Sequence, residues 1–184
     1  WKDREADDGM AHACHTAATL RKVLHVVHTA DKDMRMFCGT HVAWNSYAIT
    51  DVPLGAYDVI GSDHKQYGHK WFWLQMLQGD TADHIPGLPK VGEKGAEELL
   101  AGTTCNDEAR ELVIGKYIDK MGWDRWADHF VEQAVLLWMR TDYRASLRSV
   151  LPMLGDGPEV LAAMLRLEGR VRAARYDLRR LQCA

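Results

Sequence analysis

Residues 78–100 read QGDTADHIPGLPKVGEKGAEELL and combine two features that bear on both fold and chemistry. Asp80 and Asp83 are three positions apart, so a helical turn would place both carboxylates on one face. Gly87 and Gly92 then flank a short turn, and glycine tolerates the positive φ and the close backbone approach that such turns require. The stretch therefore predicts an acidic pair that leads directly into a helical hairpin.

The hairpin predicts a contact with a nucleic-acid backbone. A helix that begins after Gly92 has free backbone N–H groups at its start, and these groups suit a phosphate. Lys90 and Lys94 add positive charge for the same backbone. We expect a helix-hairpin-helix in which Gly87, Lys90, Val91, Gly92 and Lys94 hold DNA without reading its bases. An ordinary helix-loop-helix is the alternative.

A second acidic cluster lies at the start of the chain. Residues 5–20 have apolar positions at spacings of three and four, which predicts a helix. Glu5, Asp7 and Asp8 fall in its first turn. Acidic residues are favoured there by the helix dipole alone, so helix capping is the alternative to a functional role.

The third acidic cluster follows a predicted buried strand at residues 23–29, which are short, β-branched and bounded by charges. Asp31 and Asp33 come directly after it, at the carboxyl edge where open α/β sheets build their sites. A surface turn is the alternative for this pair alone.

Together, the three clusters predict a metal site. Packed carboxylates repel one another and need cations between them. Mg²⁺ or Mn²⁺ suits such oxygen ligands, and two such ions can drive phosphodiester cleavage. Zinc is not expected, because His12, Cys14 and His15 lack a second ligand pair at zinc spacing.

The rest of the pattern predicts an α/β fold with two regions. We expect a second strand at residues 40–47 and a helix at 64–77, and then only helices. The later helices are predicted at residues 93–100, 108–121, 126–140 and 158–181. Residues 1–78 would form the C-terminal part of an α/β core, and residues 79–184 a helical DNA-binding region. The arginines of the last helix fit a solvated face as well as a DNA contact.

Composition is compatible with a nucleic-acid partner. Apolar residues make up 47% of the 184, which indicates a folded domain, and the net charge is −3. Removing the seven carboxylates expected to face metal ions leaves about +4 for the remaining surface. No apolar run is long enough to span a membrane. The four scattered cysteines are expected to be reduced, in a cytoplasmic protein.

The order of these motifs resembles the 5′→3′ exonuclease/flap endonuclease family, which includes the 5′ nuclease domain of bacterial DNA polymerase I and phage exonucleases. The resemblance runs from about residue 4 to residue 101 and rests on EADD at 5–8, TADKD at 29–33 and GDTADHIPG at 79–87. The helical tail, with Trp123 and Trp126, is more similar to phage exonucleases. His84 departs from the family, since many members carry Asn there, and we expect little catalytic effect.

The resemblance implies a partial PIN-like (resolvase-like) parallel-sheet core followed by the helix-hairpin-helix region. It also implies hydrolysis of DNA by two Mg²⁺ or Mn²⁺ ions, with K⁺ at the hairpin. The expected substrate is double-stranded DNA with a 5′ end or flap, or an RNA–DNA hybrid, in replication or repair. The implied metal ligands are Glu5, Asp7, Asp8, Asp31, Asp33, Asp80 and Asp83. Of these, Asp8, Asp31, Asp33 and Asp80 are expected to be catalytic.

One absence leaves a second hypothesis open. Family members begin with a strand that carries an essential aspartate, followed by a basic arch, whereas this sequence starts at Trp1 inside the acidic pattern. We therefore expect an N-terminal truncation, and the alternative function is a catalytically impaired DNA-binding module. A phosphatase or RNase on a similar core is a third possibility, which the hairpin disfavours.

Overall fold

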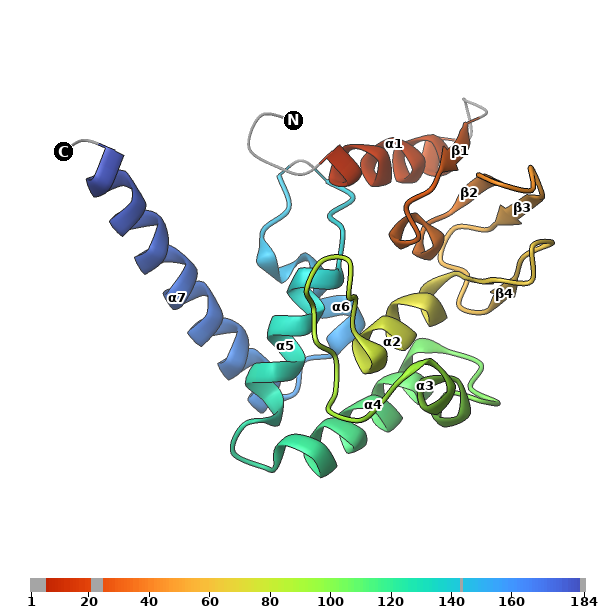
Figure 1. Cartoon of the computed structure of the whole chain (residues 1–184). Coiled ribbons are helices and arrows are strands. Elements are labelled where there is room, and N and C mark those ends of the chain that lie inside the picture. Colours follow the sequence, from red (N-terminus) through yellow and green to blue (C-terminus); the bar gives the residue numbers. More distant parts are fainter. Residues whose placement is uncertain (1–5, 21–24, 143, 183–184) are drawn as a thin grey trace.

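The computed structural model of the chain describes residues 6–20, 25–142 and 144–182. A small sheet with neighbouring helices forms one part of the molecule, and a group of helices forms the rest (Figure 1). The predicted α/β class is therefore confirmed. None of the described helices is long and apolar enough to cross a membrane.

The sheet has three short strands that follow the first helix. These elements are α1 (Ala6–Leu20), β1 (Val26–Thr29), β2 (Gly39–Ala43) and β3 (Ile49–Val52). β1 pairs with β2 in parallel, whereas β3 is antiparallel to β2. A short 3₁₀ helix, η1 (Asp33–Met36), connects β1 to β2. The expected parallel sheet is thus parallel in its first pair only.

The strand predicted at residues 40–47 is too long at its C-terminal end. β2 ends at Ala43, and the chain then reverses, with the Tyr47 amide donating to the Ala43 carbonyl at 2.9 Å. Asn45 and Ser46 are residues that favour turns, and they break the apolar pattern on which the prediction relied. The reversal makes β3 the antiparallel neighbour of β2.

The helix predicted at residues 64–77 begins later than expected. Its first part is instead a hairpin of β4 (Val59–Ile60) and β5 (Gln66–Tyr67), with His64 in the turn at a φ of 62°. The helix α2 is His69–Gln78 and starts after Gly68, which has a φ of 82°. The positive φ at Gly68 redirects the chain, and the sequence pattern did not separate this turn from the helix.

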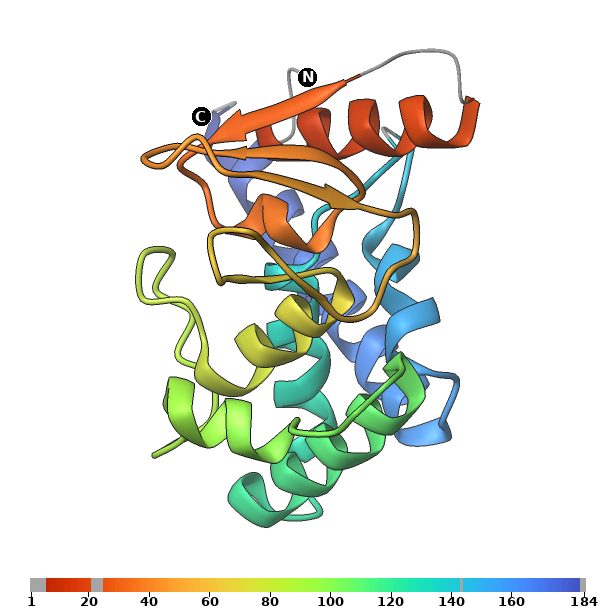
Figure 2. The ribbon, with the colours of Figure 1, turned by 90° about the vertical axis from the view of Figure 1, so that its right-hand side faces the viewer.

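Helices make up the regular structure that follows Gly79 in the described residues. They are α3 (Glu93–Leu99), α4 (Asn106–Met121), α5 (Trp126–Leu137), η2 (Leu147–Val150), α6 (Leu151–Leu154) and α7 (Pro158–Gln182). α5 ends three residues before the predicted Arg140. Figure 2 shows the sheet at one end of the molecule and α3 and α4 toward the other, while α7 reaches back to the level of the sheet.

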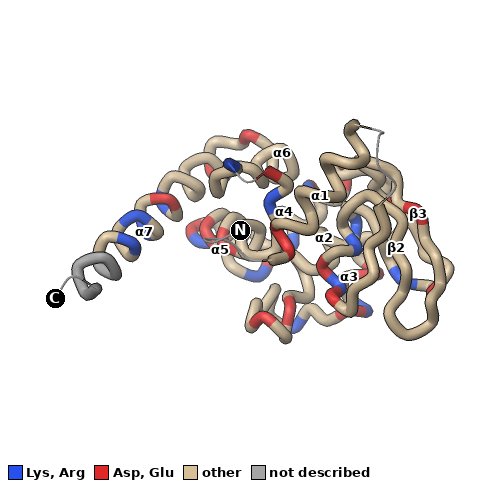
Figure 3. The backbone as a smooth tube through the Cα atoms, turned by 90° about the horizontal axis from the view of Figure 1, so that it is seen from above, with Lys and Arg blue, Asp and Glu red and all other residues tan. Residues whose placement is uncertain are grey.

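The long helix α7 carries charges of both signs along its length (Figure 3). Arg166 pairs with Asp128 of α5, and Arg170 pairs with Glu132 of α5, each at 2.9 Å. These contacts favour the solvated-face interpretation for those two arginines. Exposed pairs of this kind contribute little to stability, about 0–1 kcal/mol each.

The helix α2 lies at the centre of the core and is buried on every side. Phe72 and Trp73 have no exposed surface, and the Trp73 ring stacks near Phe130 of α5 with centroids 6.5 Å apart. The Tyr117 hydroxyl of α4 donates to the Met76 carbonyl at 2.7 Å. A helix that is apolar all round belongs in a core, so α2 fixes the position of whatever follows its C-terminal end.

The loop after α2 is held by two glycines whose backbones nearly touch. Gly79 and Gly87 have positive φ values of 77° and 62°. A Cβ on Gly79 would lie 2.3 Å from the Ile85 carbonyl oxygen, and one on Gly87 would lie 2.3 Å from the Gly79 nitrogen. The same loop is closed by paired backbone hydrogen bonds between Asp80 and Ile85. Only residues without a side chain fit this crossing.

The tight turn of the predicted hairpin lies at residues 88–91. Pro89 occupies its second position and Lys90 its third, with a φ of 62°, as a type II turn requires. The positive φ predicted for Gly87 is confirmed, but that for Gly92 is wrong, because Lys90 takes the left-handed position and Gly92 is extended at −101°. Residues 79–92 contain no regular helix, so the helix-hairpin-helix stays a prediction.

We expect Gly79→Ala to destabilise the fold much more than Gly102→Ala. Both glycines have positive φ, at 77° and 80°, so each alanine costs about 1–2 kcal/mol of backbone strain. A Cβ at Gly102 meets nothing within 4 Å, whereas one at Gly79 collides with backbone. Urea unfolding of both variants measures the difference, which should exceed about 2 kcal/mol. Equal losses would contradict the proposed crossing.

Candidate metal centre

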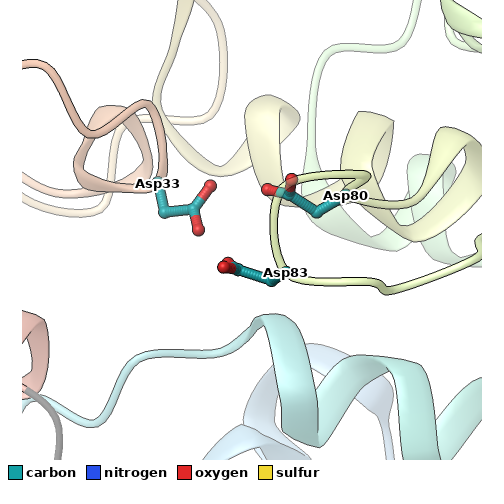
Figure 4. A group of neighbouring side chains, drawn as sticks. All are labelled: Asp33, Asp80 and Asp83. Atoms are coloured by element: carbon teal, nitrogen blue, oxygen red, sulfur yellow. The ribbon is translucent and has the colours of Figure 1, made fainter.

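Three carboxylates from two separate segments meet in one cluster (Figure 4). Asp33 is the first residue of η1, just past the carboxyl end of β1, and Asp80 and Asp83 lie in the loop after α2. One oxygen from each lies within 4.8 Å of the others. Two of the three acidic clusters predicted from the sequence therefore come together at this edge of the sheet.

Local hydrogen bonds orient these carboxylates. The Asp33 amide donates to Asp31 Oδ1 at 2.9 Å, and the Asp31 amide donates to Thr29 Oγ1 at 3.0 Å. In the other segment the Ala82 amide donates to Asp80 Oδ1 at 3.0 Å. Such side-chain to backbone bonds are typical of Asp in turns, and here they set the direction of each acidic group.

Gln75 of α2 links the two segments, and the sequence did not reveal this role. Its side chain is fully buried, and its Nε2 donates to Asp33 Oδ1 at 2.5 Å and to Asp80 Oδ2 at 3.3 Å. Its Oε1 is also buried and has no hydrogen-bond partner in the described part of the chain. A polar residue inside the apolar run WFWLQML of residues 71–77 is the signal that could have identified it.

Lys32 supplies a positive charge inside the acidic cluster. Its Nζ lies 2.5 Å from Asp80 Oδ1, and the Asp80 side chain is only 1% exposed. A buried carboxylate is costly unless it is paired, and this ammonium provides the pair. The position between the carboxylates is therefore one in which a cation is stabilised.

The two buried carboxyls have opposite pKa shifts. Burial raises the pKa of Asp33 to about 6, and the charges of Asp31 and Asp80 act in the same direction against the hydrogen bond from Gln75. Burial is the largest single effect on Asp80 and acts to raise its pKa. The hydrogen bond and the charge of Lys32 and the hydrogen bonds from the Ala82 and Asp83 amides together outweigh burial, so the pKa is lowered. Opposed shifts in neighbouring acids are common at functional sites.

The remaining predicted ligands divide into three groups. Asp7 and Asp31 line the same cleft as the cluster, a hollow of about 590 Å³. Asp8 is buried elsewhere, where it accepts from the Arg140 amide at 2.7 Å and pairs with the Arg140 guanidinium at 3.2 Å. Glu5 lies outside the described residues. The first acidic cluster thus presents Asp7 to the cleft, while Asp8 binds the segment after α5.

The residues predicted to contact DNA lie on the loop and at the start of α3. Lys90, Gly92 and Lys94 are exposed, and neither lysine forms an ion pair with the described residues. Gly87 is buried, and its amide donates to Gln133 Oε1 of α5 at 3.1 Å. Val91 is half-buried and packs against the core. Gly87 and Val91 therefore support the loop, and the two lysines are free to meet a ligand.

The donor set fits a hard divalent cation. Among the described residues, the three clustered side chains offer oxygen only, with no cysteine or histidine. Mg²⁺ and Mn²⁺ prefer carboxylate and water oxygens, whereas zinc prefers nitrogen and sulfur. The arrangement can hold a metal ion, and its chemistry disfavours zinc.

Two curated proteins are similar to about half of this chain. The flap endonuclease Xni of Shewanella amazonensis is 33% identical over 101 residues, which are 53% of this chain and 38% of that protein. DNA polymerase I of Rhizobium leguminosarum is 31% identical over 99 residues, which are 52% of this chain and 9% of that protein. The similarity therefore covers a minority of each relative. No family model and no solved structure matches the chain.

We expect Asp33→Asn to stabilise the metal-free protein, and to do so more at pH 8 than at pH 5. The raised pKa of Asp33 means that the folded state holds its proton more tightly than the unfolded state does. The carboxyl therefore costs stability as the pH rises from about 4 through about 6, and asparagine removes this cost. Thermal unfolding in EDTA at both pH values measures the effect.

The matched control is Asp124→Asn, an exposed aspartate between α4 and α5. It should leave the unfolding temperature nearly unchanged at both pH values. A gain from Asp33→Asn that does not depend on pH would contradict the electrostatic explanation.

Proposed function

This chain is related to the 5′→3′ exonuclease family, and we propose that it is the part of a structure-dependent 5′ nuclease that holds the metal ions and the DNA. The proposed reaction is hydrolysis of phosphodiester bonds in DNA that has a 5′ end or flap. The observation that carries the proposal is the meeting of Asp33, Asp80 and Asp83 at the carboxyl end of β1. The names of the two relatives support the same class of substrate.

In this proposal the three clustered aspartates hold one Mg²⁺ or Mn²⁺ ion, and Asp7 and Asp31 in the same cleft hold a second. Bound ions of this kind would supply an activated water and charge stabilisation for the leaving oxygen. Gln75 keeps Asp33 and Asp80 at ligand distance. Lys32, which pairs with Asp80 and lines the same cleft, would supply a positive charge for a phosphate there.

In this proposal Asp8 can bind a metal ion only if its ion pair with Arg140 is broken. Otherwise, we propose that Asp8 anchors the segment after α5 and that Asp7 is the ligand from the first acidic cluster. Glu5 is retained in the proposed ligand set on the family resemblance alone.

The proposed DNA grip is the loop that follows the cluster. Lys90 and Lys94, with the backbone from Gly87 to Gly92, would hold the duplex in a helix-hairpin-helix, with K⁺ bound by the loop carbonyls. The two regions proposed from the sequence, residues 1–78 and 79–184, would then hold the scissile phosphate and the duplex respectively. The short chain between Asp83 and Lys90 would fix the spacing between the two.

A DNA-binding module without turnover is the second candidate function. The observation that favours it is the pair between Asp8, one of the expected metal ligands, and Arg140. The two candidates share the DNA grip and differ in whether a strand is cut.

We expect Mn²⁺- or Mg²⁺-dependent cleavage of a 5′-labelled flap duplex, and we expect Asp31→Ala plus Asp80→Ala to abolish it. Removal of metal ligands commonly costs orders of magnitude in rate. Duplex binding by the double variant in the same assay separates lost chemistry from lost folding. Cleavage that survives the double substitution or EDTA would exclude the nuclease, and binding without any cleavage would support the module.

We expect Lys90→Ala plus Lys94→Ala to weaken duplex binding at all sequences. Each lost phosphate contact should reduce the slope of log K against log salt by about 1. Fluorescence anisotropy across a salt series measures both values. The control is Lys120→Ala plus Arg125→Ala, two exposed cations, one in the last turn of α4 and one just before α5. An equal change in slope for the two pairs would argue against the hairpin as the grip.

A further inference from the structure

Three aromatic rings gather on the surface where the sheet ends. The ring centroid of His28 lies 4.7 Å from that of Trp44 and 5.9 Å from that of Tyr47. Trp44 is 54% exposed and Tyr47 is 69% exposed. Large aromatic side chains usually bury most of their area, so three that cluster in solvent contribute little to the core. We refer to His28, Trp44 and Tyr47 as the aromatic platform.

Backbone hydrogen bonds hold the platform in place, and the backbone of Tyr47 is strained there. His28 lies on β1, and the two other rings come from the turn at residues 44–47 between β2 and β3. The Tyr47 amide donates to the Ala43 carbonyl, and the Ala43 amide donates to the Ala48 carbonyl, both at 2.9 Å. Tyr47 has a φ of 56°, which is uncommon for a bulky residue. Such strain clusters at binding and catalytic sites.

The platform adjoins the acidic cluster. His28 and Asp31 are three residues apart, so their Cα atoms can be no more than about 11 Å from each other. Trp44 and Asn45 line a small cleft of about 100 Å³ that Asp31 also lines. Asp31 in turn lines the larger cleft that holds Asp33, Asp80 and Asp83. The two clefts thus share Asp31, and Trp44 is the platform residue that lines the smaller one.

Two cations share the small cleft with Trp44 and Asp31. Arg35 and Lys65 line the same small cleft. Arg35 lies over the Trp71 ring at 4.9 Å and forms no ion pair with any carboxylate in the described ranges. Lys65 is 51% exposed and lies 3.7 Å from Asp63. Positive groups beside aromatic rings are the combination by which proteins hold single strands.

We propose that the aromatic platform stacks an unpaired base of the DNA strand next to the metal centre. The proposal rests on the proposed nuclease function and adds a preference for substrates with single-stranded nucleotides beside the cut. Because every base has a π-face, the contact discriminates unpaired from paired bases and not one sequence from another. The exposed sheet face beside the rings carries the Thr40–Asp51 polar pair, and also Val26 and Ile49, which are 54% and 61% exposed.

The test compares binding of two DNAs by the same chain with Ca²⁺ in place of Mg²⁺. One DNA is a blunt duplex, and the other is the same duplex with an unpaired 5′ tail that carries 2-aminopurine. The variants are Trp44→Ala and Trp44→Phe. The control is Trp123→Ala, which removes a tryptophan that is 75% exposed between α4 and α5. Sedimentation of each variant reports self-association.

We expect Trp44→Ala to weaken binding of the tailed DNA about 10-fold, which corresponds to the loss of one base stack. Blunt duplex binding should be unchanged, Trp44→Phe should restore most of the affinity, and the 2-aminopurine quenching should fall with Trp44→Ala only. The base-stacking proposal would be overturned if Trp44→Ala affected both DNAs equally, affected neither, or changed the oligomeric state instead. Any of these results would leave the nuclease proposal intact. Failure of the unchanged chain to bind either DNA would overturn both.

Discussion

The close approach of two backbones at Gly79 and Gly87 is the constraint on which the candidate site depends. The Cβ distances of 2.3 Å leave no room for any side chain at either position. This crossing turns the chain back across the end of α2 and allows Asp80 to pair with Ile85. Because α2 is buried on all sides, Asp80 acquires a fixed position relative to Asp33. The lack of side chains at Gly79 and Gly87 therefore determines how the carboxylates of Asp80 and Asp33 are placed relative to each other.

The site also shows how a protein keeps like charges together. Gln75 donates to two carboxylates at once, and Lys32 neutralises one of them. Even so, burial and neighbouring charges leave Asp33 with a raised pKa, which means that its charged form is destabilised in the folded chain. A divalent ion would relieve that repulsion. The fold therefore tolerates an unfavourable arrangement that a ligand can make favourable, as functional sites commonly do.

Much of the site could be predicted because its signals are local. Asp80 and Asp83 lie just before Gly87 and Gly92, which indicate a turn, and Asp31 and Asp33 follow the predicted strand at residues 23–29. The misses depend on contacts distant in sequence or on single dihedral angles. Gln75 reads as an interruption in an apolar helix until Asp33, 42 residues away, is placed beside it. The pair between Asp8 and Arg140 joins residues 132 positions apart, so the sequence alone did not reveal it. The turn at 44–47 was missed because Tyr47 adopts a positive φ without being glycine, and the helix predicted from residue 64 started too early because His64 does the same.

The contacts of α1 have a consequence for the order in which the chain assembles during synthesis. Asp8 binds Arg140, 132 positions later, and His12 contacts the Thr141 carbonyl, 129 positions later. The acidic segments at Asp33 and Asp80 need far less of the chain to meet. As the chain emerges from a ribosome, the cluster can thus form before α1 makes its contacts with Arg140 and Thr141. The contacts of α1 with the segment after α5 are therefore among the last that these described residues can make.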